Sequence, residues 1–241
     1  MADYRKDNPQ SIEQMFDSIA KSYDRTNAIL SFGLHHYWNS TLVNKILNDH
    51  KNDIMLDLCC GTGEIAFRSL KKKNKPRKIH LLDFSEEMLS CAQAKAKKNR
   101  YEKSALNYIK ADAQAVPLRN ESIDCVTIAY GIRNVKSPEK CMKEVFRLLE
   151  NGGSFAILEL TRPKNPFLRY FHQIYLKTFL PVLGKLFAAN KEAYKYLCQS
   201  IHHFVEPEEL ERLLTKSGFK KVEHYPLNGG IATIIIAKKI L

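Results

Sequence analysis

The sequence has no apolar stretch long enough to cross a membrane. No hydrophobic run in the 241-residue chain reaches the roughly 18 residues that a transmembrane helix needs. The N-terminus, Met-Ala-Asp-Tyr-Arg-Lys-Asp, also lacks the apolar core of a secretory signal peptide. We therefore expect a soluble protein that stays in the cytoplasm, with enough hydrophobic residues (44%) to bury a sizeable core.

The sequence also lacks the cysteine and histidine spacings of disulfide frameworks and metal sites. Six cysteines are present, including the adjacent pair Cys59-Cys60, but there is no Cys-x-x-Cys. We expect them to be small core residues in a reducing compartment. The adjacent pairs His35-His36 and His202-His203 lack the i, i+4 helical spacing that lets two imidazoles share a metal ion. We predict no metal site.

Acidic residues are fewer than basic ones: 26 Asp and Glu against 38 Lys and Arg give a formal net charge of +12. Basic residues cluster at 71–78 and 95–103, which we expect on the side of the sheet away from the glycine turn at 61–63. Such clusters usually form a solvated surface. The more specific interpretations are that they bind an anionic membrane surface or a nucleic acid. Because no exposed aromatic residues alternate with these lysines, base stacking has little support.

A buried strand that runs into a glycine turn is the most informative segment present, Ile54-Met-Leu-Asp-Leu-Cys-Cys-Gly-Thr-Gly-Glu64. Gly61 and Gly63 let the backbone bend sharply and approach a ligand, since glycine tolerates positive φ and has no Cβ. A helix is expected to follow from Glu64. A strand–turn–helix unit of this kind is a cofactor site at the carboxyl edge of a parallel sheet.

Asp57 distinguishes between two cofactors. Gly61-x-Gly63-x-x-Ala66 also satisfies the dinucleotide fingerprint when it is read loosely. However, the Asp57 carboxylate at the mouth of the turn would oppose a pyrophosphate on the helix N-terminus. The same carboxylate suits a cation such as the α-amino group of S-adenosylmethionine, so we favour this cofactor over NAD.

Two further predicted strands end in acids. Asp83 lies 20 residues after Gly63, the spacing at which an acid accepts hydrogen bonds from ribose hydroxyls. Asp112 suits the exocyclic amine of adenine, and the backbone N–H of Ala113 can reach a ring nitrogen. Each acid alone could simply cap a helix or a turn. Three acids at the ends of three successive strands predict one adenosyl ligand with a free amino-acid end.

Strands and helices alternate along the chain. Buried strands are predicted at 123–130 and 154–160, with a helix at 138–150 between them. This alternation predicts a mainly parallel sheet with helices on both faces. Strands at 221–227 and 231–238 then form an antiparallel hairpin. The fold class is α/β, with the Rossmann-like seven-stranded sheet of class I methyltransferases in one domain, 1–241.

Two segments lie outside this predicted scaffold. Residues 1–50 have a helical pattern and form a predicted cap. Residues 161–200 form a predicted helical insertion, in which 167–187 is dense in aromatic residues and leucine. Since the sheet already has its helices, this surplus apolar surface suggests a lid or a groove for a greasy substrate.

Seven segments carry a family resemblance: Phe16-Asp17, Tyr23-Asp24-x-x-Asn27, Leu30-Ser-Phe-Gly-Leu-His35-x-x-Trp38, the glycine turn, Tyr130-Gly-Ile-Arg-Asn134, Asn190-Lys-Glu-Ala-Tyr-Lys-Tyr-Leu197 and Ser200-Ile201. Through them, nearly the whole chain from Met15 onward resembles the quinone-biosynthesis C-methyltransferases, which methylate demethylmenaquinol and, in some members, a polyprenyl benzoquinol. The resemblance implies S-adenosylmethionine as cosubstrate and a lipophilic quinol substrate, and it leaves a homodimer open. The greasy substrate and the basic surface together suggest transient contact with the inner face of a membrane.

When the cofactor contacts of the family are transferred to the matching positions of this sequence, the resemblance implies contacts at Thr62, Asp83, Asp112, Ala113 and Ala129. Members often carry a hydroxyl at the last of these positions, so only a backbone contact is expected there. The stretch Phe204-Val-Glu-Pro departs from some members, which leaves the quinone head group open. We take demethylmenaquinol as the first substrate and a polyprenyl methoxy-benzoquinol as the alternative.

The chemistry of this resemblance assigns roles to further residues. Methyl transfer needs an electron-rich carbon about 3 Å from the activated methyl group. A quinol ring becomes nucleophilic when a hydroxyl is deprotonated, which requires a base and a cation beside the oxygen. We predict Arg133 as the cation, Asn134 as a hydrogen-bond partner of the second ring oxygen, and His35, Tyr23 or else Tyr130 as the proton acceptor. Further candidates for the lining of the quinone pocket are Tyr194 and His202.

Two other classes of function rank lower. An amino-methylating nucleic-acid enzyme needs Asn/Asp-Pro-Pro-aromatic after the fourth strand, where this chain has Ala-Tyr-Gly-Ile-Arg-Asn. A cytosine-C5 enzyme needs Pro-Cys in the same area, and the nearest cysteine, Cys125, lies in mid-strand. A cofactor-binding subunit without activity would have lost Arg133 or the apolar insertion. We therefore predict an enzyme and no nucleic-acid partner.

Overall fold

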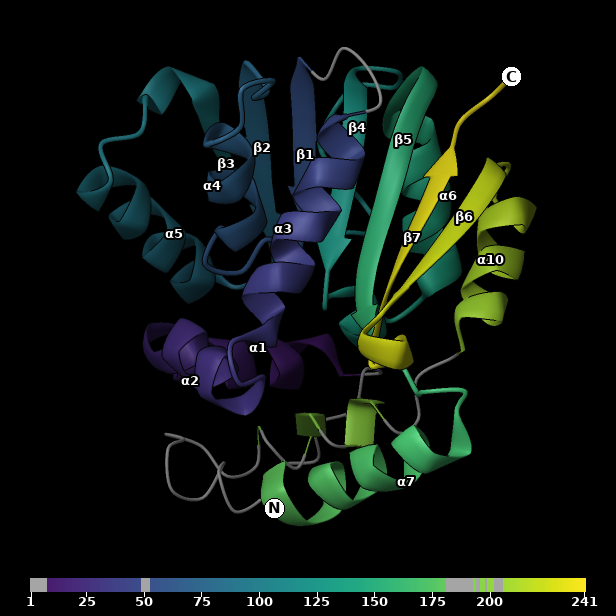
Figure 1. Cartoon of the computed structure of the whole chain (residues 1–241). Helices are drawn as coiled ribbons and strands as arrows, with labels where there is room; N and C mark the ends of the chain where they lie inside the picture. Colours follow the sequence, from purple (N-terminus) through teal and green to yellow (C-terminus); the bar gives the residue numbers. More distant parts are fainter. Residues whose placement is uncertain (1–7, 49–52, 181–192, 194–195, 198, 202–205) are drawn as a thin grey trace.

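The computed structural model describes residues 8–48, 53–180, 193, 196–197, 199–201 and 206–241 (Figure 1). Its centre is one seven-stranded sheet of order β3-β2-β1-β4-β5-β7-β6, in which β1 to β5 are parallel and β7 is antiparallel to both of its neighbours. The predicted mainly parallel sheet with an antiparallel C-terminal hairpin is confirmed. The strands are β1 Ile54–Leu58, β2 Lys78–Asp83, β3 Leu106–Lys110, β4 Ile123–Ala129, β5 Leu149–Leu160, β6 Lys220–Leu227 and β7 Ala232–Lys238.

Helices cover both faces of the sheet, and each face has its own apolar core. One core joins the sheet to α3 (Leu34–Leu47), α4 (Glu64–Leu70) and α5 (Glu86–Lys98). The other joins it to α6 (Pro138–Leu148) and α10 (Pro207–Lys216). Local signals start two of these helices, because the hydroxyls of Ser85 and Ser137 accept hydrogen bonds from N–H groups in the first turns of α5 and α6.

The segment predicted as a cap divides between the sheet and its edge. Within residues 1–50, α3 packs on the sheet because its face of Leu42, Val43 and Ile46 is fully buried in the core. Only α1 (Pro9–Ile19) and α2 (Tyr23–Leu30) lie at the carboxyl edge of the parallel strands (Figure 1). The predicted insertion contributes α7 (Pro166–Ile174) at the same edge.

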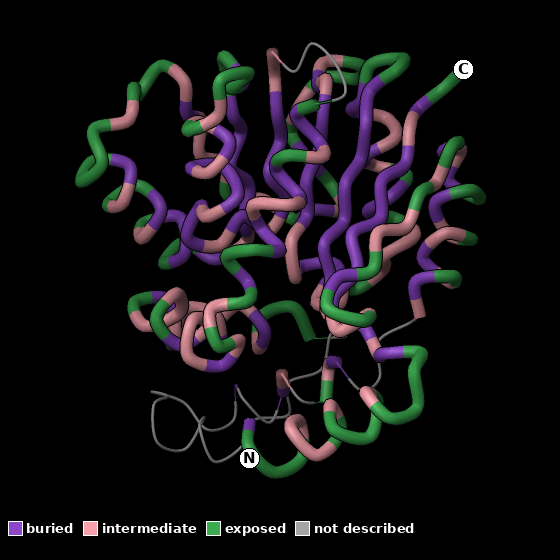
Figure 2. Tube along the Cα trace, viewed as in Figure 1, coloured by how far each residue is buried: buried purple, intermediate pink, exposed green. Residues whose placement is uncertain are grey.

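The carboxyl edge of the sheet therefore gathers segments that are far apart in sequence. Asp57 in β1 is in register with Leu81 of β2 and Thr127 of β4, so the parallel strands end together. The glycine turn leaves β1 at this edge, and α1, α2 and α7 lie beyond the edge, in the lower part of Figure 1. Figure 2 shows the sheet buried and α7 intermediate to exposed throughout. None of the helices that the structure describes combines the length and the apolar character needed to cross a bilayer.

Candidate functional site

The glycine turn is shaped by two residues with positive φ. Gly63 has φ +81°, and a Cβ there would lie 2.6 Å from the ring of Phe67, so only glycine fits. Gly61 has φ +54°, and its Cβ would meet only Tyr23 within 4 Å, at 3.9 Å. The backbone at Gly61 thus faces the helical cap, not packed core, and it is open to a ligand.

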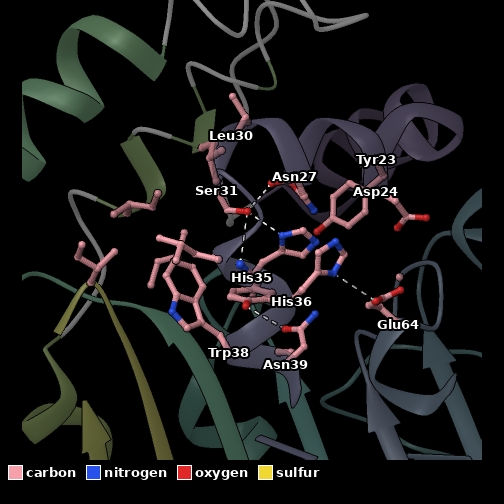
Figure 3. Close-up of a pocket in the computed structure, with 18 of the residues that line it drawn as sticks. Tyr23, Asp24, Asn27, Leu30, Ser31, His35, His36, Trp38, Asn39 and Glu64 are labelled. Carbon is pink, nitrogen blue, oxygen red and sulfur yellow. Dashed lines mark hydrogen bonds and ion pairs between the residues drawn. The ribbon is translucent and has the colours of Figure 1, made fainter. Parts of the chain in front are cut away.

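A cavity of about 380 Å³ lies between this turn, α2, α3, the end of β4 and α7 (Figure 3). Its wall from α7 onward is apolar and aromatic except for His172, whereas its wall from the turn and the end of β4 carries most of the polar groups. Seven of the predicted site residues come together in its lining: Tyr23, His35, Asp57, Gly61, Thr62, Ala129 and Arg133.

A second, smaller cavity of about 40 Å³ adjoins the first. The two cavities share Tyr23, Cys59, Gly61, Ala129 and Tyr130 in their linings. The smaller one adds two predicted site residues, one at the end of β2 and one after β4: Asp83 and Asn134. The tip of the turn and the end of β4 therefore lie between two spaces, a small one and a larger, mainly apolar one.

Asp57 has a carboxylate that is incompletely satisfied. Its side chain is buried, and Oδ1 accepts a hydrogen bond of 2.8 Å from the hydroxyl of Thr127. No described residue hydrogen-bonds Oδ2. Burial raises the pKa of Asp57 to about 7, because charge is costly away from water. A cationic group in the cavity would satisfy this oxygen and favour the ionised form.

Asp83 ties the turn to the end of β2. Its Oδ2 accepts a hydrogen bond of 2.8 Å from the Gly61 N–H, and its Oδ1 accepts one of 3.0 Å from the Ser85 N–H. Burial raises its pKa to about 6, against the lowering effect of these backbone donors. Each carboxylate oxygen keeps a second lone pair, so Asp83 can also accept from hydroxyl groups on a ligand.

Thr62 links the turn to the cap and to α5. Its hydroxyl donates to Asp24 at 2.6 Å and accepts from Lys95 Nζ at 2.8 Å. Lys95 also forms an ion pair with Asp24. The expectation that the whole cluster 95–103 lies away from the glycine turn is therefore wrong for Lys95, because its long side chain reaches back from α5 to the turn.

Three predicted cofactor residues lie outside both cavity linings. Gly63 shapes the turn on the side that packs against Phe67, away from the cavities. Asp112 is exposed, and both of its carboxylate oxygens accept hydrogen bonds from the side chain of Gln114. Ala113 beside it is buried. The structure thus places these residues at the correct sheet edge without bringing them into the two cavities.

Arg133 forms a buried ion pair with Glu159 at the end of β5, a residue that the sequence analysis did not single out. Arg133 Nη1 donates to Glu159 Oε1, and the side chains are 8% and 1% exposed. Neither Arg133 Nε nor Glu159 Oε2 has a hydrogen-bond partner among the described residues. Burial raises the pKa of Glu159, although Arg133 lowers it. Glu159 is the one charged residue in the otherwise apolar segment Phe155–Leu160. A carboxylate in such a buried strand needs a partner of opposite charge, and this was the sequence signal for the ion pair.

His35 lies between Ser31 and His36 on the cavity wall (Figure 3). The Ser31 hydroxyl lies 2.7 Å from both the Asn27 carbonyl oxygen and His35 Nδ1. In the tautomer in which this hydroxyl donates to the carbonyl, Nδ1 carries the ring proton and Nε2 is the acceptor. Burial, followed by the neighbouring His36, lowers the pKa of His35 to about 4, so the ring is neutral at neutral pH.

The remaining predicted residues act as hydrogen-bonding groups. Burial raises the pKa of Tyr23, which keeps its hydroxyl protonated and makes it a donor at neutral pH. The side chain of Asn134 donates to the Tyr130 carbonyl at 3.3 Å and accepts from the Tyr196 hydroxyl at 2.8 Å, so its two ends are already engaged. The candidates Tyr194 and His202 lie outside the described residues.

Metal ligands are not gathered in the part of the chain that the structure describes. No three His, Cys, Asp or Glu side chains lie close enough there to hold a metal ion. The five cysteines in this part are free, and three of them, Cys60, Cys125 and Cys141, are buried.

Comparison with known proteins gives consistent matches. The model of the ubiE/COQ5 methyltransferase family matches residues 4–239. The demethylmenaquinone methyltransferase of Protochlamydia amoebophila is 50% identical over 99% of both chains. The mitochondrial 2-methoxy-6-polyprenyl-1,4-benzoquinol methylase of Oryza sativa is 33% identical over 95% of this chain and 83% of its own. A SAM-dependent methyltransferase structure from Thermotoga maritima covers 94% of this chain and 98% of its own, with 21% identity and a TM-score of 0.63, which confirms the predicted fold class.

Proposed function

Because the chain belongs to the ubiE/COQ5 methyltransferase family, we propose that it transfers a methyl group from S-adenosylmethionine to a ring carbon of a polyprenyl hydroquinone. Demethylmenaquinol is the proposed substrate. The observation that carries this choice is the 50% identity, over nearly the full length of both chains, to a demethylmenaquinone methyltransferase. Arg133 in the wall of a largely apolar cavity supports a substrate with one ionisable end and a hydrophobic body.

The residues at the glycine turn fit S-adenosylmethionine. The unsatisfied Oδ2 of buried Asp57 suits an α-ammonium group, and the open backbone at Gly61 allows close approach. Asp83 in the smaller cavity would accept from ribose hydroxyls. When bound, this cosubstrate supplies a methyl group already activated on a sulfonium, so the protein has to orient the reactants and needs no metal. These residues would hold it with its amino-acid end toward Asp57.

The larger cavity fits a quinol with a hydrophobic tail. Its polar groups lie beside the glycine turn and the end of β4, while Leu168, Phe171 and Leu176 line the side toward α7. A ring placed near Ala129 and Arg133 would present a carbon to the space shared by the two cavities. The tail would then lie along the apolar wall and leave past α7.

The chain's residues can activate the ring without a strong base. The Arg133 guanidinium, always charged, stabilises negative charge on the ring oxygen as its proton leaves. Glu159 holds that guanidinium in one orientation through the buried ion pair. The neutral His35 accepts a proton or a hydrogen bond through Nε2, and the Tyr23 hydroxyl donates to a developing oxyanion. Most of the rate acceleration would come from the orientation of the reactants and from the charge of Arg133.

The benzoquinol reading remains the second candidate because one relative, 33% identical, bears the name of a benzoquinol methylase. It differs in the head group only. The fold, the cofactor residues and Arg133 serve both substrates equally.

Methyl transfer from labelled S-adenosylmethionine would test the proposal. The acceptors are chemically reduced demethylmenaquinone, a reduced polyprenyl methoxy-benzoquinone and total RNA, assayed side by side. We expect label in the naphthoquinol, and we expect Arg133→Ala to remove at least about 99% of it, since loss of one charge-stabilising group costs on the order of 10²-fold in rate. Label in the benzoquinol alone would overturn the head-group assignment, and label in RNA alone would overturn the proposed function.

A further inference from the structure

Five aromatic side chains on the molecular surface are largely exposed to solvent. We define the aromatic rim as Phe32, Phe167, Tyr170, Phe171 and Phe179, which are exposed by 50% to 74%. Three of them lie on α7, where none of the nine residues is buried (Figure 2). Exposed aromatic residues in such density mark an interaction site, because isolated surface apolar residues are common but clusters are not.

The aromatic rim is continuous with the lining of the larger cavity at two residues. Phe32 and Phe171 line that cavity and are at the same time exposed. Phe32 contacts the ring of Tyr175 with the centroids 5.9 Å apart, and the Tyr175 hydroxyl donates to the Leu30 carbonyl, which joins the end of α2 to the segment after α7. The rings of Phe167 and Phe171 lie 4.7 Å apart. The aromatic residues of α7 are therefore connected to the cavity through Phe171.

The charge around α7 has one sign. The segment 161–180 contains four basic residues and no acidic one: Arg162, Lys164, Arg169 and Lys177. Arg162 and Lys164 are paired with Glu206 and Glu208. Arg169 and Lys177 are exposed and form no ion pair with any residue that the structure describes. The helix with the exposed aromatic residues thus also presents uncompensated positive charge.

We propose that the aromatic rim docks on the surface of an anionic lipid bilayer and opens the larger cavity toward the hydrocarbon. Aromatic side chains favour the membrane interface, and lysine and arginine beside them are attracted to anionic headgroups. The inference rests on the proposed function, because a polyprenyl tail is confined to the bilayer and must enter the cavity from it. The basic clusters at 71–78 and 97–103 then belong to the solvated face.

Vesicle flotation tests the docking surface. The vesicles contain phosphatidylcholine with phosphatidylglycerol, or phosphatidylcholine alone. We expect the protein to float with the anionic vesicles and Phe167→Ser/Tyr170→Ser to lower its bound fraction by about fivefold or more, since two apolar side chains leave the interface. Neither residue lines the cavities. The matched control, Ile240→Ser/Leu241→Ser, removes exposed apolar side chains at the C-terminus, across the molecule from α7 (Figure 1), and should bind like the parent protein.

A charge-matched pair separates the segment that follows α7 from the other basic residues. We expect Lys177→Gln to weaken binding to anionic vesicles by about threefold to fivefold. Lys73→Gln, which removes the same charge from the exposed cluster at 71–78, should leave it unchanged. The reverse order would place the membrane contact on the other side of the sheet and overturn the proposal.

Activity measurements distinguish this inference from the proposed function. Phe167→Ser/Tyr170→Ser should methylate a short-tail quinol in solution at the parent rate, but a long-tail quinol in anionic vesicles at about a fifth of it or less. Equal flotation of the parent and this variant would overturn the docking surface. Failure of the parent protein to float with anionic vesicles would also overturn it. The same holds if light scattering shows that the parent protein is a dimer and that the substitutions dissociate it. Flotation of a protein that methylates no quinol would instead contradict the proposed function.

Discussion

Asp57 is a buried carboxyl group with a hydrogen bond to only one of its two oxygens, and its ionisation affects the stability of the fold. Its pKa in the folded protein is about 7, above the ordinary 3.8, so between these pH values the folded state holds a proton that the unfolded state has released. The stability that this group contributes is present below about pH 4 and is lost as the pH rises through about 7. An ionised Asp57 therefore opposes folding at neutral pH, which is expected of a residue retained for a ligand.

We predict that Asp57→Asn raises the midpoint of thermal unfolding of the ligand-free protein at about pH 8, because it removes a buried charge. The same variant should bind S-adenosylmethionine at least tenfold more weakly there. In the parent protein the dissociation constant should rise as the pH falls below about 7, by up to tenfold per unit, as Asp57 becomes protonated. Calorimetry across this range measures both effects.

Asp112→Asn is the control for this pH dependence. The Asp112 carboxylate is exposed at the same sheet edge and accepts from Gln114. Its variant should keep the pH dependence of the parent protein, whatever it does to the affinity. A wild-type pH profile in Asp57→Asn would contradict the role given to Asp57.

The Arg133–Glu159 pair makes a second prediction at this scale. Glu159→Gln leaves the guanidinium buried without a counter-charge, which should lower the free energy of unfolding by about 3 kcal/mol and the turnover number together. Arg133→Met/Glu159→Gln, without either charge, should recover most of the stability but none of the activity. Urea unfolding and quinol methylation measure the two quantities. A single variant as stable as the parent protein would show that the two side chains are not a buried pair in solution.

At the scale of the element, the strand–turn–helix unit depends on the backbone at Gly63. Its neighbours leave no room for a side chain, since a Cβ would lie 2.6 Å from Phe67 and 3.2 Å from Leu81. Gly152 offers a matched comparison, because it has φ +85°, close to the +81° of Gly63, but has nothing within 4 Å of a Cβ.

We predict that Gly152→Ala lowers the free energy of unfolding by about 1 kcal/mol, the cost of positive φ for an L-residue. Gly63→Ala should cost a further 1–3 kcal/mol or so, because the added methyl group overpacks the core beneath the turn. The difference between the two variants in urea unfolding isolates the steric contribution. Equal losses would mean that Phe67 moves aside at little cost.

At the scale of the whole molecule, the helices of the N-terminal segment are tied to the last hairpin. Trp38 on α3 is buried, and its indole N–H donates to Asn228 between β6 and β7 at 2.6 Å, across 190 residues of sequence. Trp38 is also the one tryptophan of the chain. Its fluorescence therefore reports on the contact between the beginning and the end of the predicted single domain.

We predict that urea unfolding followed by Trp38 fluorescence and by far-UV circular dichroism gives coincident transitions, as one cooperative domain requires. Substituting Asn228→Ala should shift both curves equally, because the lost hydrogen bond stabilises the same unit. A fluorescence transition that clearly precedes the loss of helix would divide the chain into two units and contradict a single domain over 1–241.

The sequence alone determined the sheet, the glycine turn and the acids that follow the strands. Alternation of apolar runs and Gly61-x-Gly63 are local signals, because period and φ act within a few neighbouring residues. Once parallel strands are expected, Asp57 and Asp83 must meet at one edge. The family resemblance added Arg133 and His35, and the structure places both in the wall of one cavity.

Only the tertiary structure decided which side chains meet. Glu159 pairs with Arg133 from 26 residues away, and Lys95 reaches Thr62 from 33 residues away, and neither distance is encoded in a local pattern. The same holds for α7, whose apolar sequence suggests a lid or a groove, because only the structure shows that none of its residues is buried and that Leu168 and Phe171 line the larger cavity. Packing of the whole chain decides which side chains meet, because the surrounding segments exclude water from a buried group. The exclusion of water sets both the cost of burying a charge and the strength of its ion pair.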